Sequence, residues 1–386
     1  MDVILVLIES QQQFAFFSRC IYGFKNLSYQ MEFVTNLLSV YLQCSLKNIP
    51  CSLTRFPKEI KKNKDFSQCG ELRYGYFTQH QANVYYSSFA ERIEKILLMK
   101  SAALSLIWGG GDTVASVAMI DQCRLRSIPI LYIDRANIKG KIFVDPKGMN
   151  FNSELYQNIS LLDMVNPDTL MYERYRKEFM TTYGRTGSGA RKKINWFLPM
   201  DILYSRFVRL PYRGATNFRK KLGEIFFKKD SIIYDDYILA EGNYIFVPLN
   251  HSFEICKESK DYLLAEEIIK CACSLAKELQ KDVVVKFHPA ENDRSFILFI
   301  NSLKNKYHFV IRHEDSRTLL VNAYRVVASN TSVALEAMLL KRPIVHFGKS
   351  LYKELDEKRL INFVTSFLID VDIYSNDRIK YQGLYL

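Results

Sequence analysis

Two stretches, Val283–Pro289 (VVVKFHP) and Val326–Gly348 (VVASNTSVALEAMLLKRPIVHFG), decide the fold class of this chain. Each begins with a short apolar run rich in valine, which predicts a buried strand of a parallel sheet. Polar residues follow both runs: Lys286 and His288 close the first, and Asn330-Thr331-Ser332 opens a helix in the second. Because open α/β sheets bind ligands at the carboxyl ends of their strands, these polar ends predict a ligand crevice.

The helix start at Thr331 and Ser332 suits a phosphate, because its free N–H groups and the positive end of its dipole attract anions. A single His at a strand end more often has a structural role, and Thr or Ser at a helix start often only caps it. The two segments together favour a nucleotide site instead. We expect this site to comprise the polar residues of both turns and one carboxylate, namely Lys286, His288, Pro289, Asn330, Thr331, Ser332 and Glu336.

Glu336 stands one turn into that helix, within the apolar segment VALEAMLL. An unpaired carboxylate in such surroundings is costly. Hydrogen bonds from a ribose diol would explain its position. A salt bridge to Arg342 is the structural alternative.

Strands and helices alternate in both halves of the chain, which predicts parallel, doubly wound sheets. The first half contains expected strands at Met1–Glu9, Leu104–Trp108 and Pro129–Asp134, and the second half begins with a strand at Tyr244–Pro248. We therefore expect an α/β fold of two Rossmann-like domains facing a central cleft, the GT-B architecture of nucleotide-sugar glycosyltransferases. The expected parts are an acceptor-side domain (1–205), a basic linker (206–240), a nucleotide-binding domain (241–350) and a helical tail (351–386) that crosses back to the first domain.

The composition favours a cytoplasmic protein of two domains. Hydrophobic residues make up 48% of the 386 residues, and no apolar run approaches the roughly 20 residues that a membrane span needs. Met1–Glu9 is too short for a signal peptide. The eight cysteines show no Cys-x-x-Cys spacing, so we expect free thiols and no metal site.

The net charge of +12 is concentrated in two segments with interleaved aromatic residues, Arg174–Lys193 and Arg206–Lys229. No recognised nucleic-acid-binding motif accompanies them, so we expect no nucleic-acid partner. Basic, aromatic-rich segments also suit anionic lipid headgroups, which predicts peripheral binding at the inner face of a membrane. A solvated linker explains the same composition equally well.

Two carboxylates are candidates for catalysis. Asp134 ends an expected strand, where α/β active sites gather, and Glu254 follows the first strand of the second half. Gly111 and Asp112 end a glycine run between an expected strand and a helix, where a backbone can approach a ligand closely. A helix N-cap is the alternative role for Asp112, and either catalytic candidate could be an ordinary loop acid.

Across roughly residues 104–350 the chain resembles the capsule-polysaccharide synthesis family of bacterial β-Kdo transferases, which use CMP-Kdo. The likeness rests on segments that match family motifs in order and spacing: Gly111-Asp112, Asp134 through Asn150 to Ser153 and Leu155, Pro248-Leu249-Asn250 to Glu254, Lys286 to Pro289, and Thr331 through Gly348. Four positions depart from the family pattern: Asp134 replaces Glu, Arg135 replaces Gly, Ile138 replaces a basic residue, and Glu254 replaces Asp.

The resemblance implies transfer of an acidic sugar, Kdo, from CMP to a glycolipid or glycan during surface-polysaccharide assembly, with retention of configuration and without a cofactor. Glu254 would then be the nucleophile, Asp134 the base for the acceptor hydroxyl, and Gly111, Asp112, Asn150 and Ser153 the residues that bind acceptor or sugar. A polyol-phosphate transferase of the teichoic-acid type and a non-catalytic polysaccharide-export component are the alternatives.

Overall fold

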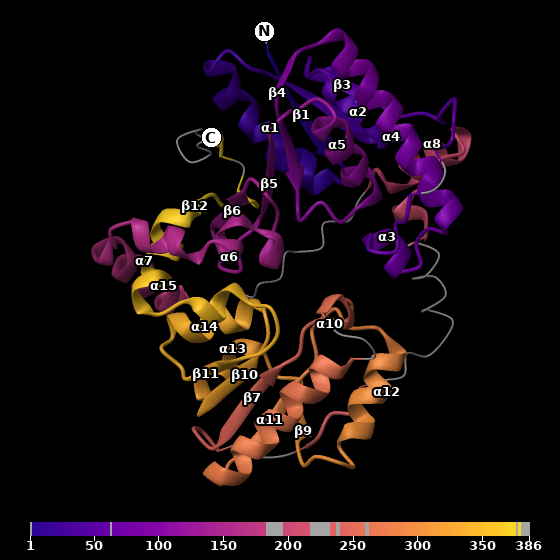
Figure 1. The fold of residues 1–386 in the computed structure, drawn as a ribbon. Helices are drawn as coiled ribbons and strands as arrows, with labels where there is room; N and C mark the ends of the chain where they lie inside the picture. The colour runs from indigo at the N-terminus through magenta and orange to yellow at the C-terminus, as the bar shows by residue number, and fades with distance from the viewer. Residues whose placement is uncertain are drawn as a thin grey trace. The chain divides into compact units, whose positions relative to one another are not determined.

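The structure is a computed structural model that describes residues 2–61, 64–182, 196–216, 232–236, 240–258, 262–375 and 377–379. The chain forms two compact units (Figure 1). Unit 1 contains the described residues of 1–158, 190–228 and 367–386, and unit 2 those of 159–189 and 229–366. Each unit is built on its own largely or wholly parallel sheet, which confirms the α/β class with two Rossmann-like domains.

Unit 1 has a seven-stranded sheet with the order β12-β6-β5-β4-β1-β2-β3. Its strands are β1 (Val3–Ile8), β2 (Gln30–Thr35), β3 (Cys51–Leu53), β4 (Ala102–Trp108), β5 (Ile130–Arg135), β6 (Lys141–Asp145) and β12 (Leu368–Asp370). Its helices are α1 (Gln11–Asn26), α2 (Leu38–Leu46), α3 (Gly70–Arg73), α4 (Gln79–Met99), α5 (Val114–Arg124), η1 (Asn150–Asn152), α6 (Glu154–Gln157) and α8 (Leu198–Phe207). The strands from β3 to β5 pair in parallel, and β6 and β12 extend the sheet in antiparallel pairing.

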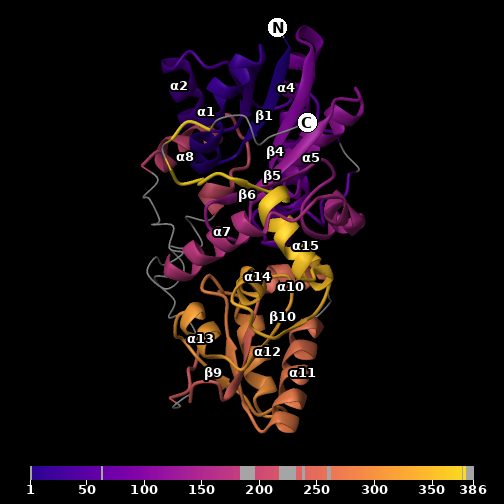
Figure 2. The same cartoon turned by 90° about the vertical axis from the view of Figure 1, so that its left-hand side faces the viewer.

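The sheet of unit 1 is covered on both faces, because its central strand is apolar at every position. All six residues of β1 are buried, and alternate ones point to opposite faces. Val3, Leu5 and Leu7 join the core under α4 and α5, whereas Ile4, Val6 and Ile8 join the core under α1 and α2. Figure 2 shows these helix pairs on the two sides of β1. A continuous apolar run of this kind is typical of a parallel strand.

Unit 2 has a five-stranded parallel sheet with the order β11-β10-β7-β8-β9. Its strands are β7 (Tyr244–Pro248), β8 (Asp282–Lys286), β9 (Val310–Ile311), β10 (Arg325–Ala328) and β11 (Ile344–His346). Its helices are η2 (Ile159–Met164), α7 (Thr169–Thr182), α10 (Ser252–Glu258), α11 (Leu263–Leu279), α12 (Arg294–Leu303), α13 (Ser316–Asn322), α14 (Ser332–Leu339), η3 (Leu351–Glu354), α15 (Glu357–Asn362) and η4 (Phe363–Phe367), whose last residue belongs to unit 1. The strands predicted from the two valine-rich stretches are therefore both present and parallel.

The division of the chain differs from the expected boundaries at residues 159–182 and in the tail. The segment 159–182 belongs to unit 2, because Asn362 Nδ2 donates to the carbonyls of Leu162 and Val165 at 2.7 and 2.8 Å. The tail is not only helical: after α15 it forms β12, which pairs with β6 in unit 1 and places Asp370 2.6 Å from Lys141. Contacts between positions so far apart in sequence leave no local pattern.

The two basic segments lie only partly within the described residues. The described part of the first, from Arg174 onward, is in α7, where Arg176 Nε donates to the carbonyl of Leu339 at 2.8 Å. Within the second, α8 ends at Phe207, and residues 217–231 lie outside the description. Among the helices that the structure describes, none has the length and apolar character to cross a bilayer.

Candidate functional site

The carboxyl edge of the unit 2 sheet has a topological switch point between β7 and β10. From β7 the chain proceeds to β8 and β9 on one side, and then to β10 and β11 on the other. Ligand crevices form at such a reversal, because the connections leave the two strand ends in opposite directions. Asn250 follows β7 and Asn330 follows β10, and the side-chain amide of Asn250 donates to the carbonyl of Asn330 at 3.3 Å.

The sheet order separates the two segments of the predicted nucleotide site. His288 follows β8 and Thr331 follows β10, and β7 lies between these two strands. The connection is made instead by His251, which follows β7: its ring centroid lies 5.7 Å from that of His288. His251 has no counterpart among the predicted site residues, although its place directly after a buried strand was a usable signal.

The ring of His288 is oriented by a backbone contact. Its Nδ1 accepts a hydrogen bond from the N–H of Ala290 at 3.1 Å, so the neutral ring has its proton on Nε2. Partial desolvation, followed by the neighbouring His251, lowers the pKa of His288 below its ordinary value. A neutral, exposed imidazole with an Nε2–H donor is therefore present at the edge of the sheet near neutral pH.

Glu291 holds this part of the edge together and was not predicted from the sequence. Its side chain is buried, at 6% exposure, and accepts hydrogen bonds from the N–H and the hydroxyl of Ser252 at 2.7 and 3.0 Å. It also accepts from the N–H groups of Asn292 and Asp293. Glu291 thus joins the turn after β8 to the first residue of α10, and a buried carboxylate so fully hydrogen-bonded is stable.

The start of α14 forms the β10 side of the crevice. Thr331 is the N-cap, and its Oγ1 accepts from the N–H of Val333 at 2.9 Å. Ser332 is exposed. Its N–H makes no hydrogen bond within the part of the chain that the structure describes. A free N–H at the positive end of a helix is a donor suited to an anion.

The other predicted nucleotide residues are more scattered. Lys286 ends β8, and its ammonium donates to the carbonyl of His313 at 3.3 Å, on the β9 side and away from α14. Burial lowers the pKa of Lys286. Pro289 is an exposed residue of the turn after His288, and Glu336 is partly buried in α14. Arg342, the alternative partner of Glu336, donates to the carbonyls of Val321 and Ala323.

Glu254, the expected nucleophile, lies in the first turn of α10 and is partly buried. Its N–H donates to the carbonyl of His251 at 2.8 Å, which places it at the same edge as the histidines. His346, at the end of β11, is a further residue that the sequence did not single out. Its Nδ1 is buried without a hydrogen-bond partner in the described chain, and burial lowers its pKa to about 4.

Unit 1 has its own switch point, between β1 and β4. Glu9 follows β1 directly, and its Oε2 accepts from the hydroxyl of Thr113, which follows β4, at 2.7 Å. Glu71, in the short helix α3, is buried and accepts from the N–H of Val114 at 3.2 Å. In the sequence Glu9 is only the last residue of an expected strand, and no residue near Glu71 in the sequence indicates that its charge interacts with Glu9.

The proximity of these carboxyl groups changes their proton affinity. Burial, and then the charge of Glu71, raise the pKa of Glu9 to about 8. Burial also raises the pKa of Glu71, and the guanidinium of Arg213 partly offsets both effects. Near neutral pH the pair therefore holds a proton that can be exchanged, which is the property of a general acid or base.

Two predictions about the glycine run are modified by the structure. Gly111 has a φ of +76°, and a Cβ at this position would lie 2.8 Å from Ile120 Cδ1 and 2.9 Å from Tyr132 Cε1. The positive φ and these close contacts together account for glycine at this position without a ligand. The N-cap of α5 is Thr113 and not Asp112, because the Thr113 hydroxyl accepts from the N–H of Ser116 at 3.1 Å.

The remaining predicted residues of unit 1 are separated from that pair. Asp134 is partly buried near the end of β5, with Oδ1 accepting from the N–H of Arg135 at 2.7 Å. Asn150 has a φ of +53° and is the first residue of η1, before α6. Ser153 is fully buried, and its hydroxyl donates to the carbonyl of Asn150 and caps α6, so it is not presented to a ligand.

Comparison with known proteins gives remote likenesses of fold. No model of a known protein family matches the chain, and no curated protein matches it. Among solved structures, the chain is similar to KpsC, a β-Kdo 2,7-transferase from Thermosulfurimonas dismutans, with 14% identity, a TM-score of 0.44 and coverage of 75% of this chain and 85% of that one. It is also similar to the UDP-GlcNAc 2-epimerase of Methanocaldococcus jannaschii, with 12% identity, a TM-score of 0.38 and 96% coverage of both chains. We draw no functional conclusion from likenesses of this degree.

Proposed function

We propose that the protein is a glycosyltransferase that transfers an acidic sugar, Kdo, from a CMP donor to a glycolipid or glycan acceptor in bacterial surface-polysaccharide assembly. The observation that supports this most strongly is the switch-point edge of unit 2. There the exposed start of α14 and the bonded pair Asn250 and Asn330 meet beside His251 and His288. The N–H of Ser332 and the Nε2–H of His288 are hydrogen-bond donors suited to a donor phosphate.

In this proposal the phosphate of the donor accepts hydrogen bonds from the N–H of Ser332 and from Nε2 of His288. Because His288 is neutral near pH 7, it contributes a donor without needing a proton from solvent. Glu336, one turn into α14, would accept from the ribose hydroxyls. Two donors directed at one anion are typical of nucleotide sites that include a helix N-terminus.

The transfer itself would use two carboxylates, Glu254 and Asp134. Glu254 would attack the anomeric carbon of Kdo as CMP departs, and the acceptor hydroxyl would then displace Glu254 while losing its proton to Asp134. Glu9 is a second candidate for the acid–base role, since a pKa of about 8 suits proton exchange near neutral pH. Gly111, Asp112 and Asn150 would lie on the acceptor side, and the basic segments would bring the enzyme to an anionic membrane surface.

Calorimetric titration of the full chain with CMP, UDP and GDP tests the donor site. CMP should bind most tightly, and His288→Ala should weaken it by about 10- to 100-fold, the value of a hydrogen bond to a charged group. His308→Ala is a matched control, because His308 is an exposed histidine elsewhere in unit 2. Equal CMP affinities in both variants would contradict the assignment of the phosphate site.

The same titrations separate the alternatives. Preference for UDP would exclude a CMP donor, and binding of CDP-ribitol with transfer of phosphorus to the product would indicate a polyol-phosphate transferase. Binding of CMP without any turnover of CMP-Kdo would favour a non-catalytic component of polysaccharide export.

A further inference from the structure

Unit 1 contains a cavity of about 670 Å³, and Gly111 is the one predicted site residue that lines it. It is formed by α5, the glycine run after β4, the strand β5 and the loop after β6. Its volume is within the range of roughly 300–1,000 Å³ that is usual for small-molecule sites. The residues that line it all belong to unit 1.

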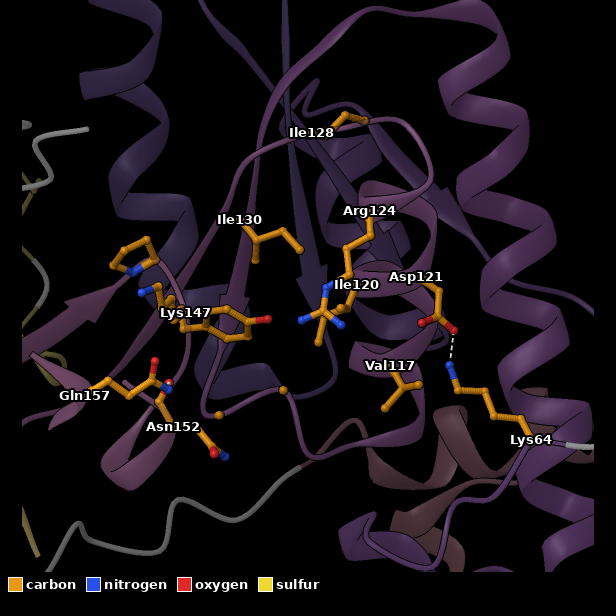
Figure 3. Close-up of a pocket in the computed structure, with 14 residues that line it drawn as sticks. Lys64, Val117, Ile120, Asp121, Arg124, Ile128, Ile130, Lys147, Asn152 and Gln157 are labelled. Atoms are coloured by element: carbon orange, nitrogen blue, oxygen red, sulfur yellow. Dashed lines mark hydrogen bonds and ion pairs between the residues drawn. The ribbon is translucent and has the colours of Figure 1, made fainter. Parts of the chain in front are cut away.

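Among the described residues, one of the three cations that line the cavity, the exposed Arg124, has no ion pair. Lys64 forms an ion pair with Asp121, which also accepts from the hydroxyl of Tyr86 at 2.6 Å. Lys147 lies 3.1 Å from Glu154. The guanidinium of Arg124, in contrast, makes no hydrogen bond or ion pair within the described residues. In Figure 3 it lies between the ion pair of Lys64 and Asp121 and the amide side chains opposite.

The rest of the lining has the mixed character that a sugar requires. Asn152 and Gln157 supply amide donors and acceptors on one side, as Figure 3 shows. Four aliphatic side chains supply apolar surface for the C–H face of a pyranose: Val117, Ile120, Ile128 and Ile130. A guanidinium without a partner favours a carboxylate or phosphate, with which it forms two parallel hydrogen bonds.

We propose that this cavity binds an anionic saccharide, a sugar unit that bears a carboxylate or a phosphate, with Arg124 contacting the anionic group and Asn152 and Gln157 contacting hydroxyls. In terms of the proposed function, on which this part of the inference rests, the saccharide belongs to the acceptor chain. The binding site itself does not depend on the identity of the donor.

The test titrates the full chain with four probes: glucuronic acid, glucose 1-phosphate, glucose and inorganic phosphate. We expect at least one of the two anionic sugars to bind about tenfold or more tightly than glucose, and the tighter of the two identifies the anionic group. Arg124→Gln should weaken that sugar about tenfold. Arg126→Gln removes the same charge two residues away and should leave the affinity unchanged, because Arg126 bonds to Gln122 outside the cavity.

Three results would overturn the inference. They are equal affinities in Arg124→Gln and Arg126→Gln, absence of saturable binding of both anionic sugars, and binding of inorganic phosphate as tight as that of the sugars, which would indicate an adventitious ion only. Titration of CMP in the same samples separates the two proposals. Failure of the unaltered protein to bind CMP contradicts the donor site and leaves the saccharide site standing, whereas CMP binding without sugar binding does the reverse.

Discussion

Replacement of Glu9 by Gln should reduce the pH dependence of the stability of unit 1 between pH 5 and 9. The pKa of Glu9 is about 8 in the folded protein and about 4.5 in the unfolded chain. A carboxyl group with a raised pKa favours the folded state below pH 4.5, and this contribution is lost as the pH rises through 8. Gln keeps an oxygen that accepts from the Thr113 hydroxyl, so the variant should fold.

The size of the effect follows from the difference between the two pKa values. Each tenfold difference in proton affinity corresponds to about 1.4 kcal/mol, which gives about 5 kcal/mol as an upper value for Glu9. Because Glu9 is only partly buried, solvent screening reduces this figure, and we expect a loss of about 2–4 kcal/mol between pH 5 and pH 9. Glu71→Gln should shift the midpoint of the loss to lower pH, since the charge of Glu71 contributes to the raised pKa.

Urea unfolding followed by tryptophan fluorescence measures this effect. Both tryptophans of the chain, Trp108 and Trp196, belong to unit 1. A Trp196→Phe background leaves Trp108, which packs against Phe16 with ring centroids 5.0 Å apart and so reports the core under α1. The unfolding free energy is measured against pH in this background, once with Glu9 retained and once with Glu9→Gln. Parallel curves for the two proteins would refute the reasoning, because they would mean that Glu9 has an ordinary pKa.

Three further predictions concern single side chains. Gly111→Ala should lower the unfolding free energy of unit 1 by about 2–4 kcal/mol in the same fluorescence assay, because of the positive φ and the close contacts at this position. Gly110→Ala is the control: its Cβ would lie 3.6 Å from Met149 Cβ, so the loss should be less than half as large. Glu291→Gln should lower the unfolding free energy of unit 2 by about 1–3 kcal/mol in urea, because a buried N–H or hydroxyl of Ser252 loses its acceptor. An unchanged unfolding free energy would mean that this contact does not contribute to stability. The CMP affinity of the unaltered protein divided by that of His288→Ala should grow as the pH falls through 6.5. The bound phosphate raises the lowered pKa of His288, so protonation of the ring strengthens binding in the unaltered protein alone. A ratio that stays constant with pH would exclude contact between His288 and the phosphate.

The parallel strands of both units could be predicted because each is an apolar run with a polar end. The strands around Val283 and Val326 are found where the pattern places them, and so is the helix that begins at Ser332. The antiparallel strands β6 and β12 could not be predicted, since Leu368–Asp370 is short and pairs with a strand more than two hundred residues earlier. Register of that kind depends on tertiary contacts.

The candidate site was predictable in its parts and not in its arrangement. His288 and Thr331 were found from strand ends, but the sheet order that separates them follows from the packing of all five strands. Glu291 gave no signal, because its partners become apparent only when the ends of β7 and β8 are adjacent. Glu9 and Glu71 were missed for the same reason: the raised pKa arises from proximity and burial, which neither residue's neighbours in sequence reveal.

The most direct test of the central claim is a transfer assay with purified protein, CMP-Kdo and a Kdo-free glycan acceptor, in which released CMP and glycosylated product are both quantified. The proposal predicts equal amounts of CMP and product, loss of both in Glu254→Gln, and unchanged CMP affinity in that variant. Full activity of Glu254→Gln would remove Glu254 from the mechanism, and absence of CMP release from CMP-Kdo with every acceptor tested would contradict the assignment of the protein as a CMP-Kdo-dependent glycosyltransferase.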